Sequence, residues 1–294
     1  MNGLFSKIGI IGKPGDPKVK TTVRTLADHL LGHGLEVVTE ARTNELLDSG
    51  AGSACPLGTL GEQCDLVIVV GGDGTFLGAA RALAASGVPL LGVNLGRLGF
   101  LVDISPVVLL DAVDRIFTGD FDEEYRFLLS ARVGQFPDQG AQSPALNDVV
   151  LHKWNTPRMV EFETYIDGRF VNAQRSDGLI ISTPTGSTAY ALSGGGPLLD
   201  PSLNALLIVP ICPHTLSNRP IVVSGNSRIE IRLCGGDHAH VRISCDGQSD
   251  RQIGAGEHLY IQKYTHPVRL LHPKGHDHYK ILRAKLGWGG HPSL

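Results

Sequence analysis

Cysteine pairs and long apolar runs are both missing from this chain of 294 residues. The five cysteines are Cys55, Cys64, Cys212, Cys234 and Cys245, and no Cys-x-x-Cys pair occurs. An odd number at scattered spacing argues against a secreted disulfide scaffold and against a zinc knuckle. No window approaches the ~18 consecutive apolar residues that a membrane span needs. We therefore predict a cytoplasmic protein whose cysteines are small, buried side chains.

A strong charge of one sign is absent as well. The formal net charge is −3, so no overall positive field attracts nucleic acid or an anionic membrane. An anionic ligand must therefore be held by a local site. The sequence contains no G-x-x-x-x-G-K-[ST], which excludes a P-loop enzyme, and no G-x-G-x-x-G after the first predicted strand, which argues against a dehydrogenase.

Glycine is abundant, with 37 residues where an average content of ~7% would give roughly 20. No Gly-X-Y period accompanies this excess, so we place it in turns and in loops that approach a ligand closely. Hydrophobic residues make up 42% of the chain and charged residues 19%, which is an ordinary globular balance. The length suits one large domain or two of ordinary size.

The first part of the chain alternates short apolar runs with helical patterns. Asp16 and Pro17 resemble an N-cap and a first helical position, and apolar residues then recur at helical spacing up to Leu30. This order predicts an α/β nucleotide-binding domain over residues 1–119, with a parallel sheet of Rossmann-like, doubly wound type. The predicted strands are 7–12, 35–40, 66–70 and 88–93, the later helices are 76–86 and 106–117, and residues 48–61 are predicted to be a loop.

From about Asp120 helical periodicity nearly disappears, and short strand-like segments separated by turn signals such as Asp167-Gly168 take its place. This pattern predicts an all-β sandwich over residues 120–275. A helical pattern returns near the end, so we expect a C-terminal helix at about 276–294 that packs back on the first domain. The predicted strands are 125–133, 148–152, 159–166, 179–182, 228–233, 240–245 and 258–264.

The apolar strand 66–70 runs directly into Gly71-Gly72-Asp73-Gly74-Thr75, and a helix follows. Ligands of open α/β sheets lie beyond the carboxyl ends of the strands. Glycines there let backbone N–H groups approach an anion, and the helix N-terminus favours phosphate. Asp73 can then accept a proton from an attacking hydroxyl or help to hold a metal. The alternative is a tight turn in which Asp73 only caps the helix.

A second glycine-rich segment, NLGRLGFL at 94–101, follows the next predicted strand. The carboxyl ends of parallel strands share one sheet edge, so this segment would lie beside the first one. Arg97 could reach a phosphate there, although an exposed loop charge is an equally good interpretation. The predicted phosphate site consists of Gly71, Gly72, Gly74, Thr75 and Arg97.

A polar run of Ser, Thr and Gly at 176–197 interrupts the predicted β domain. It cannot be a strand interior or a core helix, because Gly and Pro break it repeatedly. Backbone N–H groups, small side chains and the ring of Tyr190 suit a nucleoside, whereas a structural Ω-loop is the alternative. Asn147-Asp148 and Asp246-Gly247-Gln248 are weaker signals that ordinary turn chemistry also explains.

Histidine is concentrated near the C-terminus, where His272, His276 and His278 lie close to Asp277. A metal cluster is conceivable there. Because Pro273, Lys274 and Gly275 border the run and no cysteine accompanies it, we expect a solvated loop before the last helix.

In combination these segments closely resemble the NAD kinase family. The blocks are GGDGT at 71–75, NLGRLGFL at 94–101, ALNDVVLHK at 145–153, SDGLIISTPTGSTAYALSGGGP at 176–197, PHTLSNRPIV at 213–222 and CDGQ at 245–248. The resemblance implies transfer of the γ-phosphate of ATP to the 2′-hydroxyl of the adenosine ribose of NAD. It also implies Mg²⁺ as cofactor and a homodimer or homotetramer, and it agrees with the two domains predicted above.

The resemblance implies roles for individual residues. Asp73 would be the general base that takes the proton of the ribose 2′-hydroxyl, with Gly74 beside the dinucleotide. Asn147 and Asp148 would hold ribose hydroxyls, although many relatives carry the longer Glu at the second position. The other residues implied to bind NAD are Arg158, Arg175, Asp177, Thr188, Ala189, Tyr190, Ser193 and Gln248. We assign no side chain as a metal ligand.

Two other functions stay open at this point. GGDGT also occurs in lipid kinases of the diacylglycerol and sphingosine type, but no basic amphipathic helix or lipidation signal is evident. A non-catalytic NAD(P)-sensing protein could use the same pockets, although it would have no need of Asp73 at the transfer point. The sequence does not distinguish NAD from NADH, or ATP from polyphosphate, and it does not address NADPH feedback.

Overall fold

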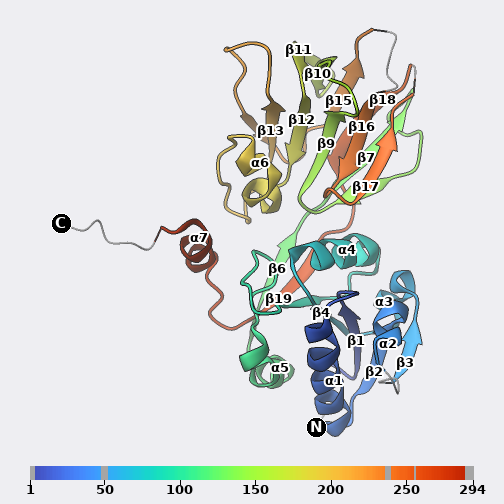
Figure 1. The fold of residues 1–294 in the computed structure, drawn as a ribbon, viewed down its shortest axis with the longest axis vertical. Coiled ribbons are helices and arrows are strands. Elements are labelled where there is room, and N and C mark those ends of the chain that lie inside the picture. Colours follow the sequence, from blue (N-terminus) through green and yellow to red (C-terminus); the bar gives the residue numbers. More distant parts are fainter. Residues whose placement is uncertain (1–3, 48–51, 236–239, 255, 289–294) are drawn as a thin grey trace, which may run out of the picture. The chain divides into compact units, whose positions relative to one another are not determined.

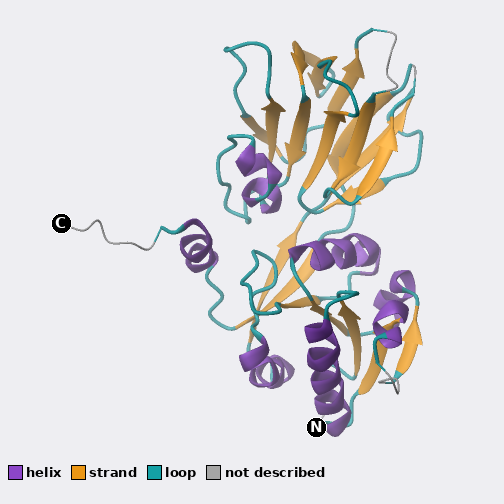
Figure 2. Ribbon diagram, viewed as in Figure 1, coloured by secondary structure: helices purple, strands orange, loops and turns teal. Residues whose placement is uncertain are grey.

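The computed structural model describes residues 4–47, 52–235, 240–254 and 256–288. The chain divides into two compact units, one of Met1–Tyr125 with Val268–Leu294 and one of Arg126–Pro267 (Figure 1). Helices flank the strands of the first unit, whereas strands dominate the second (Figure 2). Among the helices of the described residues, none has the length and apolar character that a membrane crossing requires.

The first unit is built on one sheet with the strand order β3-β2-β1-β4-β5-β19-β6. Neighbouring strands from β3 to β19 pair in parallel. The strands are β1 Lys7–Gly12, β2 Glu36–Glu40, β3 Ser53–Cys55, β4 Leu66–Val70, β5 Leu90–Val93, β6 Phe121–Arg126 and β19 Val268–Pro273. The helices are α1 Pro17–Gly32, α2 Ala41–Glu45, α3 Leu57–Gln63, α4 Asp73–Leu83, α5 Leu109–Phe117 and α7 His278–Leu286, with short 3₁₀ turns η1 Ala84–Ser86 and η2 Pro106–Val108. The predicted Rossmann-like α/β architecture is confirmed.

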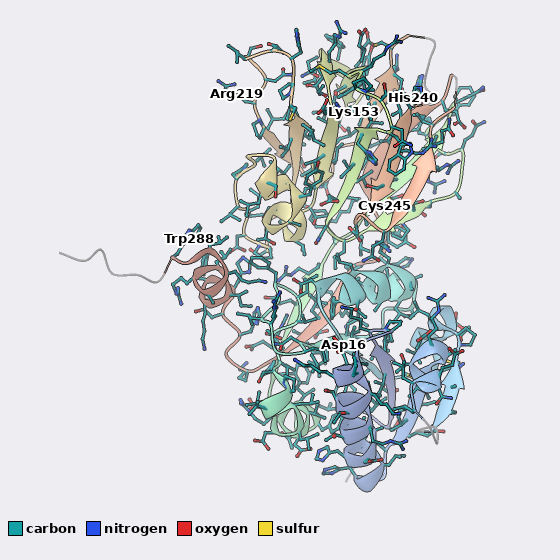
Figure 3. The ribbon with its side chains drawn as sticks, in the orientation of Figure 1. Asp16, Lys153, Arg219, His240, Cys245 and Trp288 are labelled. Carbon is teal, nitrogen blue, oxygen red and sulfur yellow. The ribbon has the colours of Figure 1, made fainter. Side chains whose placement is uncertain are left out.

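Helix α1 illustrates how the sequence determines this unit. The Asp16 side chain lies at the start of the helix (Figure 3) and accepts a hydrogen bond from the Lys18 amide at 3.0 Å, while Pro17 takes the first helical position. Val19, Val23 and Leu30 face inward and are fully buried, together with the apolar side chains of β1 and β4. Each such side chain contributes roughly 1.5–3 kcal/mol of hydrophobic stabilisation.

The loop predicted for residues 48–61 is wrong in its described part. Residues 53–55 form β3, which pairs with β2, and α3 begins at Leu57; residues 48–51 lie outside the described residues. Leu60 is fully buried, and a Cβ at Gly61 would overlap the Ser86 side chain. The small residues of this segment therefore serve close packing, which a search for apolar periodicity does not detect.

The second unit consists of two antiparallel sheets with the orders β11-β10-β15-β18-β7-β8 and β14-β13-β12-β9-β16-β17. The first of these strands are β7 Leu129–Gly134, β8 Ser143–Ala145, β9 Asp148–Lys153, β10 Val160–Ile166, β11 Arg169–Ser176 and β12 Gly178–Ser182. The later ones are β13 Ala205–Ile211, β14 Ile221–Ser224, β15 Ile229–Leu233, β16 Val241–Cys245, β17 Ser249–Gln252 and β18 His258–Lys263, and η3 Thr185–Thr188 and α6 Tyr190–Ser193 lie between β12 and β13. Strands of both sheets contribute to one apolar core, so the predicted sandwich is confirmed.

The units differ from the predicted domains at two places. Strands β6 and β19 belong to the sheet of the first unit, so residues 120–125 and 268–275 lie there rather than in the β domain. The reason is that β19 pairs with β5, which places Leu270 and Leu271 opposite Leu90 and Leu91. The segment 125–133, predicted as one strand, is divided between β6 and β7, and β13 was not predicted at all.

Candidate active site

The turn after β4 brings two strand ends of the first unit together. The Gly71 amide donates a hydrogen bond to the Val93 carbonyl at 2.9 Å, which joins the ends of β4 and β5. Helix α4 begins at Asp73, with Gly72 as an N-cap that has no side-chain hydrogen bond. A Cβ at Gly71 would lie 2.7 Å from Thr75 Oγ1, so this position of the turn accommodates only glycine. The start of α4 therefore lies beside the joined ends of β4 and β5, and a helix N-terminus at such a place can bind an anion.

Asp73 is oriented by the second glycine-rich segment. Its Oδ2 accepts a hydrogen bond from the Phe100 amide and its Oδ1 accepts one from the Leu101 amide, each at 3.0 Å. A Cβ at Gly99 would overlap Asp73 Oδ1. Asp73 is half-buried and, as the first residue of α4, its side chain does not cap that helix. The interpretation of Asp73 as a mere helix cap is therefore wrong, because its carboxylate is fixed from a separate loop.

The loop that holds Asp73 is itself closed by short-range hydrogen bonds. Asn94 is buried, and its Oδ1 accepts a hydrogen bond from the Gly96 amide at 2.8 Å. The Gly99 amide donates to the Val102 carbonyl at 3.0 Å. Arg97 is exposed at the tip of this loop, on the segment where sequence analysis placed a phosphate ligand.

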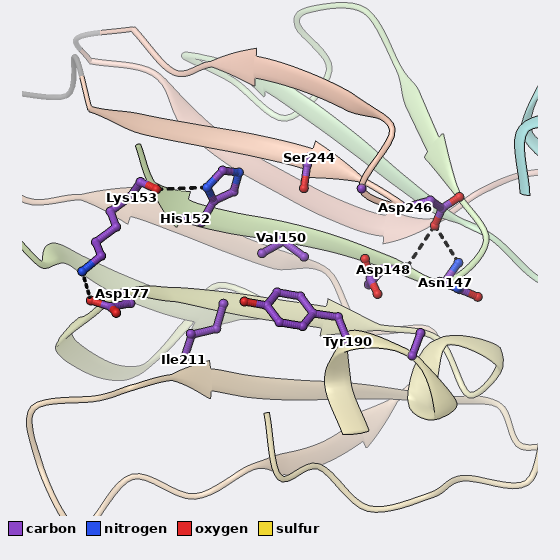
Figure 4. A pocket seen from close by; sticks show the side chains of 12 residues that line it. Asn147, Asp148, Val150, His152, Lys153, Asp177, Tyr190, Ile211, Ser244 and Asp246 are labelled. Carbon is purple, nitrogen blue, oxygen red and sulfur yellow. Dashed lines mark hydrogen bonds and ion pairs between the residues drawn. The ribbon is translucent and has the colours of Figure 1, made fainter. Parts of the chain in front are cut away.

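A cavity of about 530 Å³ lies on one face of the second sheet of the second unit (Figure 4). Alternation along β9 sends Val149 and Leu151 into the sandwich core and Asp148, Val150 and His152 to this cavity. Its volume falls in the range of typical cofactor sites. The lining residues are Asn147, Asp148, Val150, His152, Lys153, Asp177, Ala189, Tyr190, Ile211, Ser244, Asp246 and Gly247.

Asp246 organises one end of the cavity. It has φ +53° and is followed by Gly247 at φ +62°, so the turn after β16 is left-handed. Its carboxylate accepts hydrogen bonds from the amides of Leu146, Asn147 and Asp148 at 3.0, 2.8 and 3.2 Å. Asp148 is 4% exposed, and burial together with the charge of Asp246 raises the pKa of Asp148 to about 7.

Lys153 and Asp177 form the other end of the cavity. Lys153 Nζ lies 2.7 Å from Asp177 Oδ1, and about 70% of each side chain is shielded from solvent. Tyr190 extends from α6 toward the strands that line the cavity, and about half of its surface is exposed (Figure 4). An aromatic face beside carboxylates and an ammonium group can bind a base and its ribose hydroxyls.

The polar run before Tyr190 is folded by its own hydroxyls. Thr183 Oγ1 donates to the Leu146 carbonyl at 2.6 Å and accepts from the Gly186 amide at 3.1 Å. Ser187 Oγ accepts from the Leu199 amide at 3.0 Å. Both hydroxyls therefore shape the loop, as the Ω-loop interpretation expects, while nucleoside binding by this run stays a prediction.

The structure groups some of the predicted NAD residues and separates others. Asn147, Asp148, Asp177, Ala189 and Tyr190 line the cavity. Thr188 and Gln248 are next to lining residues in the sequence but do not line the cavity, and Ser193, three residues after Tyr190, does not line it either. Arg158 and Arg175 border two other cavities of about 300 and 280 Å³, and Arg175 Nε is paired with Glu161 Oε1 at 2.9 Å.

Sequence reasoning did not single out His152, Lys153 or Ser244 as lining residues. The strict alternation of Asp148, Val150 and His152 in β9 was the available signal for the histidine. Ser244 could not be found in this way, because its position depends on the pairing of β16 with β9, which sets Ser244 opposite Val150.

Comparison with known proteins decides the family. A model of the ATP-NAD kinase N-terminal domain matches residues 8–121, and a model of the ATP-NAD kinase C-terminal domain matches residues 146–272. This chain belongs to the NAD kinase family. It is 49% identical over 285 residues to an NAD kinase of Nitrosococcus oceani, with 97% of each chain covered. It is 50% identical to an NAD kinase of Pseudomonas putida, covering 97% of this chain and 96% of the relative.

Solved NAD kinase structures share the architecture. Yeast NADH kinase complexed with NADH matches with a TM-score of 0.87 and 25% identity over 100% of this chain and 93% of that one. An NAD kinase from Archaeoglobus fulgidus in complex with ATP matches with a TM-score of 0.76 and 25% identity over 97% and 100%. As a member of the NAD kinase family the chain is a phosphotransferase, and neither a lipid kinase nor a non-catalytic sensor is favoured.

Proposed function

We propose that this chain transfers the γ-phosphate of ATP to the 2′-hydroxyl of the adenosine ribose of NAD, with Asp73 as the general base. The observation that carries the role of Asp73 is the pair of amide hydrogen bonds from Phe100 and Leu101. They fix both carboxylate oxygens at the glycine-rich turn and leave each oxygen a further lone pair for a substrate proton.

In the proposed step the 2′-oxygen of the ribose forms a bond to the γ-phosphorus while the bond to the β–γ bridging oxygen breaks. Asp73 receives the hydroxyl proton and ADP leaves with the bridging oxygen. A positioned base contributes typically ~10²–10⁴-fold to such a reaction, and positioning and charge neutralisation supply much of the remainder.

The amides at the start of α4 are proposed to hold the triphosphate, with Gly71, Gly72, Gly74 and Thr75 forming the turn and Arg97 reaching it from the neighbouring loop. Gly72 and Gly74 are exposed and Thr75 is half-buried, which leaves room for an anion at this turn. The N-terminus of α4 is the positive end of the helix dipole, which would stabilise negative charge there.

The residues present fit a magnesium ion that is bound mainly by the substrate. Among the described residues, the groups of three potential metal ligands do not include Asp73. Mg²⁺ commonly uses one or two carboxylates together with phosphate oxygens, and Asp73 can supply one such carboxylate. When bound, the metal would neutralise charge on the triphosphate.

The cavity of the second unit is proposed to bind the dinucleotide. Asn147 and Asp148 would hold ribose hydroxyls, Asp177 would contact the base, and Ala189 and Tyr190 would pack against it. Thr188, Ser193 and Gln248 would complete the NAD site after small movements of their side chains. Arg158 and Arg175 are proposed as outer contacts, since they border separate cavities.

Assembly and location extend the same proposal. We propose a homodimer or homotetramer on the strength of the family resemblance. A cytoplasmic location is supported by the cysteines, since all five are free thiols and three of them are buried.

The test is an assay of purified protein with ATP, Mg²⁺ and NAD that detects NADP with a specific dehydrogenase. We expect metal-dependent NADP formation, and a loss of at least ~10²-fold in kcat for Asp73→Asn with NAD binding retained. Asp16→Asn is the matched control, because asparagine caps a helix as well as aspartate does. Near-normal turnover of Asp73→Asn would remove Asp73 from the role of base, and NAD binding without any NADP would contradict the transfer itself.

A further inference from the structure

His272 and His276 do not lie in a solvated loop. The side chain of His272 is 3% exposed and that of His276 is 6% exposed, and their rings stack with centroids 3.8 Å apart. The sequence-based expectation is therefore wrong for these two residues, because His272 belongs to β19, which is inserted in the sheet beside β5. Both rings point Nδ1 at one carboxylate oxygen, Asp103 Oδ2, at 3.1 and 2.8 Å.

We infer that Asp103, His272 and His276 form a binding site for a divalent transition metal of the zinc class. The three ligand atoms lie within 4.8 Å of one another without any metal in place. With bonds of ~2.0–2.2 Å, neighbouring ligands of a tetrahedral ion lie roughly 3.3 Å apart. The distances from Asp103 Oδ2 to Nδ1 of His272 and of His276, 3.1 and 2.8 Å, therefore need to increase by only a few tenths of an ångström.

A second observation supports the metal. In the described part of the chain, His272 Nε2 and Asp103 Oδ1 are buried without a hydrogen-bond partner, and Nε2 lies 3.7 Å from Glu124 Oε2. If Nδ1 carries the only ring proton, the bare Nε2 faces a carboxylate across this gap. A metal on Nδ1 moves the proton to Nε2, where it points to Glu124. That is the carboxylate–histidine–metal arrangement common around bound zinc.

The donor set determines the class of ion. Two imidazole nitrogens and one carboxylate suit zinc, cobalt, nickel or copper, whereas magnesium prefers oxygen ligands only. The site is therefore distinct from the one proposed for Mg²⁺ with ATP. Burial raises the pKa of Asp103, but the hydrogen bonds from both histidines outweigh burial and hold this pKa below its usual range, so the carboxylate is ionised.

The site is accessible from a cavity of about 260 Å³ that Asp103 and His276 line together with Lys280 and Ile281 of α7. A metal can therefore reach Asp103 and His276 from this cavity, and a water can complete a fourth coordination position. Catalytic zinc sites keep such an open position, while structural ones are closed by four protein ligands. Three protein ligands beside a cavity predict a site whose ion exchanges with solvent.

Asp103 lies two residues after Leu101, which is part of the loop that holds Asp73. Leu101 donates its amide to Asp73 Oδ1, and Asn94 donates its amide to the Ile104 carbonyl at 2.8 Å, so Asp103 lies between two anchors of this loop. A metal that ties Asp103 to His272 would stiffen the support of Asp73. This consequence rests on the proposed function, whereas metal binding itself does not.

The test compares metal binding by the full-length protein and by three variants. Protein stripped with a chelator is titrated with Co²⁺ and with Zn²⁺, and bound metal is measured by elemental analysis and by the visible absorption of Co²⁺. We expect about one ion per chain for the unmodified protein, and at least roughly tenfold weaker binding for His276→Gln. The matched control is His33→Gln, because the exposed His33 belongs to the cluster His29, His33 and Asp114, the other group of potential ligands among the described residues.

Each outcome decides the proposal. Equal metal binding in the unmodified protein and in His276→Gln overturns it, and loss of binding only in His33→Gln shows an adventitious surface ion only. Because a change at buried positions could impair folding, circular dichroism of each variant accompanies the titration. Asp103→Asn, which preserves the shape of the side chain, should also weaken Co²⁺ binding. If Asp103→Asn binds Co²⁺ as tightly as the unmodified chain, the carboxylate is not a ligand and the site is not as inferred.

Discussion

Asp73 in the first unit and Asp246 in the second are both held by backbone amides of another loop, but the two carboxylates differ in what they leave exposed. Asp73 accepts two amides and stays half-buried at the glycine-rich turn. Asp246 accepts hydrogen bonds from three amides. One of these amides belongs to Asp148, a second aspartate that is buried. The first arrangement orients an acceptor that keeps capacity for a substrate, while the second uses its carboxylate to shape a binding surface.

The difference shows that hydrogen bonds from amides do not by themselves indicate catalysis. The two sites differ in the groups that surround the carboxylate. Glycines and a helix N-terminus surround Asp73, whereas another acid lies beside Asp246. Burial and the charge of Asp246 raise the pKa of Asp148, so the cavity of the second unit contains an unfavourable interaction between two acids. The following predictions test this contrast.

Gly99→Ala should have the largest effect. The new Cβ overlaps Asp73 Oδ1 and comes within 2.5 Å of Val102 Cγ2, so the carboxylate must rotate away from its amides. We expect kcat to fall by ~10²-fold, or about 3 kcal/mol in activation free energy, with KM for NAD nearly unchanged. Gly32→Ala, at the end of α1 where a Cβ meets open space, is the control. A normal kcat in Gly99→Ala would show that the position of Asp73 is unimportant.

Asp148→Asn should change how stability depends on pH. In the folded chain Asp148 keeps its proton up to about pH 7, while in the unfolded chain it ionises near its ordinary value of 3.8. The folded state therefore binds more protons between these values, and stability falls as pH rises through this window. Between pH 4.5 and 8 the unfolding free energy of the unmodified chain should fall by ~2–3 kcal/mol more than that of Asp148→Asn. Urea unfolding at both pH values measures this difference.

The exposed Asp138→Asn serves as the control for this pH comparison and should leave the dependence unchanged. An identical pH dependence in Asp148→Asn and in the unmodified chain would contradict a raised pKa at this position.

Asp246→Asn should destabilise the second unit by about 2 kcal/mol, because hydrogen bonds to a charged acceptor are stronger than those to a neutral one. Loss of the charge also lowers the pKa of Asp148, which recovers part of the cost. Asp167→Asn is a close control, since Asp167 at φ +51° precedes Gly168 in a similar left-handed turn. Thermal unfolding compares the two, and equal melting temperatures would assign Asp246 to turn chemistry alone.

Lys153→Met should have the smallest effect. The ion pair with Asp177 is partly exposed, so its loss costs roughly 0.2–1 kcal/mol. We expect KM for NAD to rise by about two- to fivefold at constant kcat. Lys7→Met, which breaks the pair with Glu36 in the first unit, should leave KM unchanged. A drop in kcat instead of a rise in KM would place Lys153 in the transfer step.

Local patterns in the sequence predict much of this molecule. The strand and turn at 66–75 were predictable because a continuous apolar run ends in residues that only a tight turn accommodates. The start of α1 was predictable from Asp16 and Pro17. The alternation along β9 likewise separates core residues from cavity residues.

The remainder depends on contacts between distant segments. No local signal indicates that the amides of Phe100 and Leu101 hold Asp73, because this contact requires the loop after β5 to fold back over the start of α4. Pro210 lies inside β13 opposite Leu179, although proline usually argues against a central strand. The burial of His272 follows from the insertion of β19 into a sheet whose other described strands precede residue 127.

That insertion bears on how the protein is made. The ribosome releases β6 and then the whole of the second unit, residues 126–267, before β19 emerges to take its place between β5 and β6. At ~5–20 residues per second the synthesis of residues 126–267 lasts roughly 7 to 28 seconds. Throughout that time the nascent first unit carries two unpaired strand edges that only the end of the chain can close. The unit that begins the sequence is therefore the last to be completed.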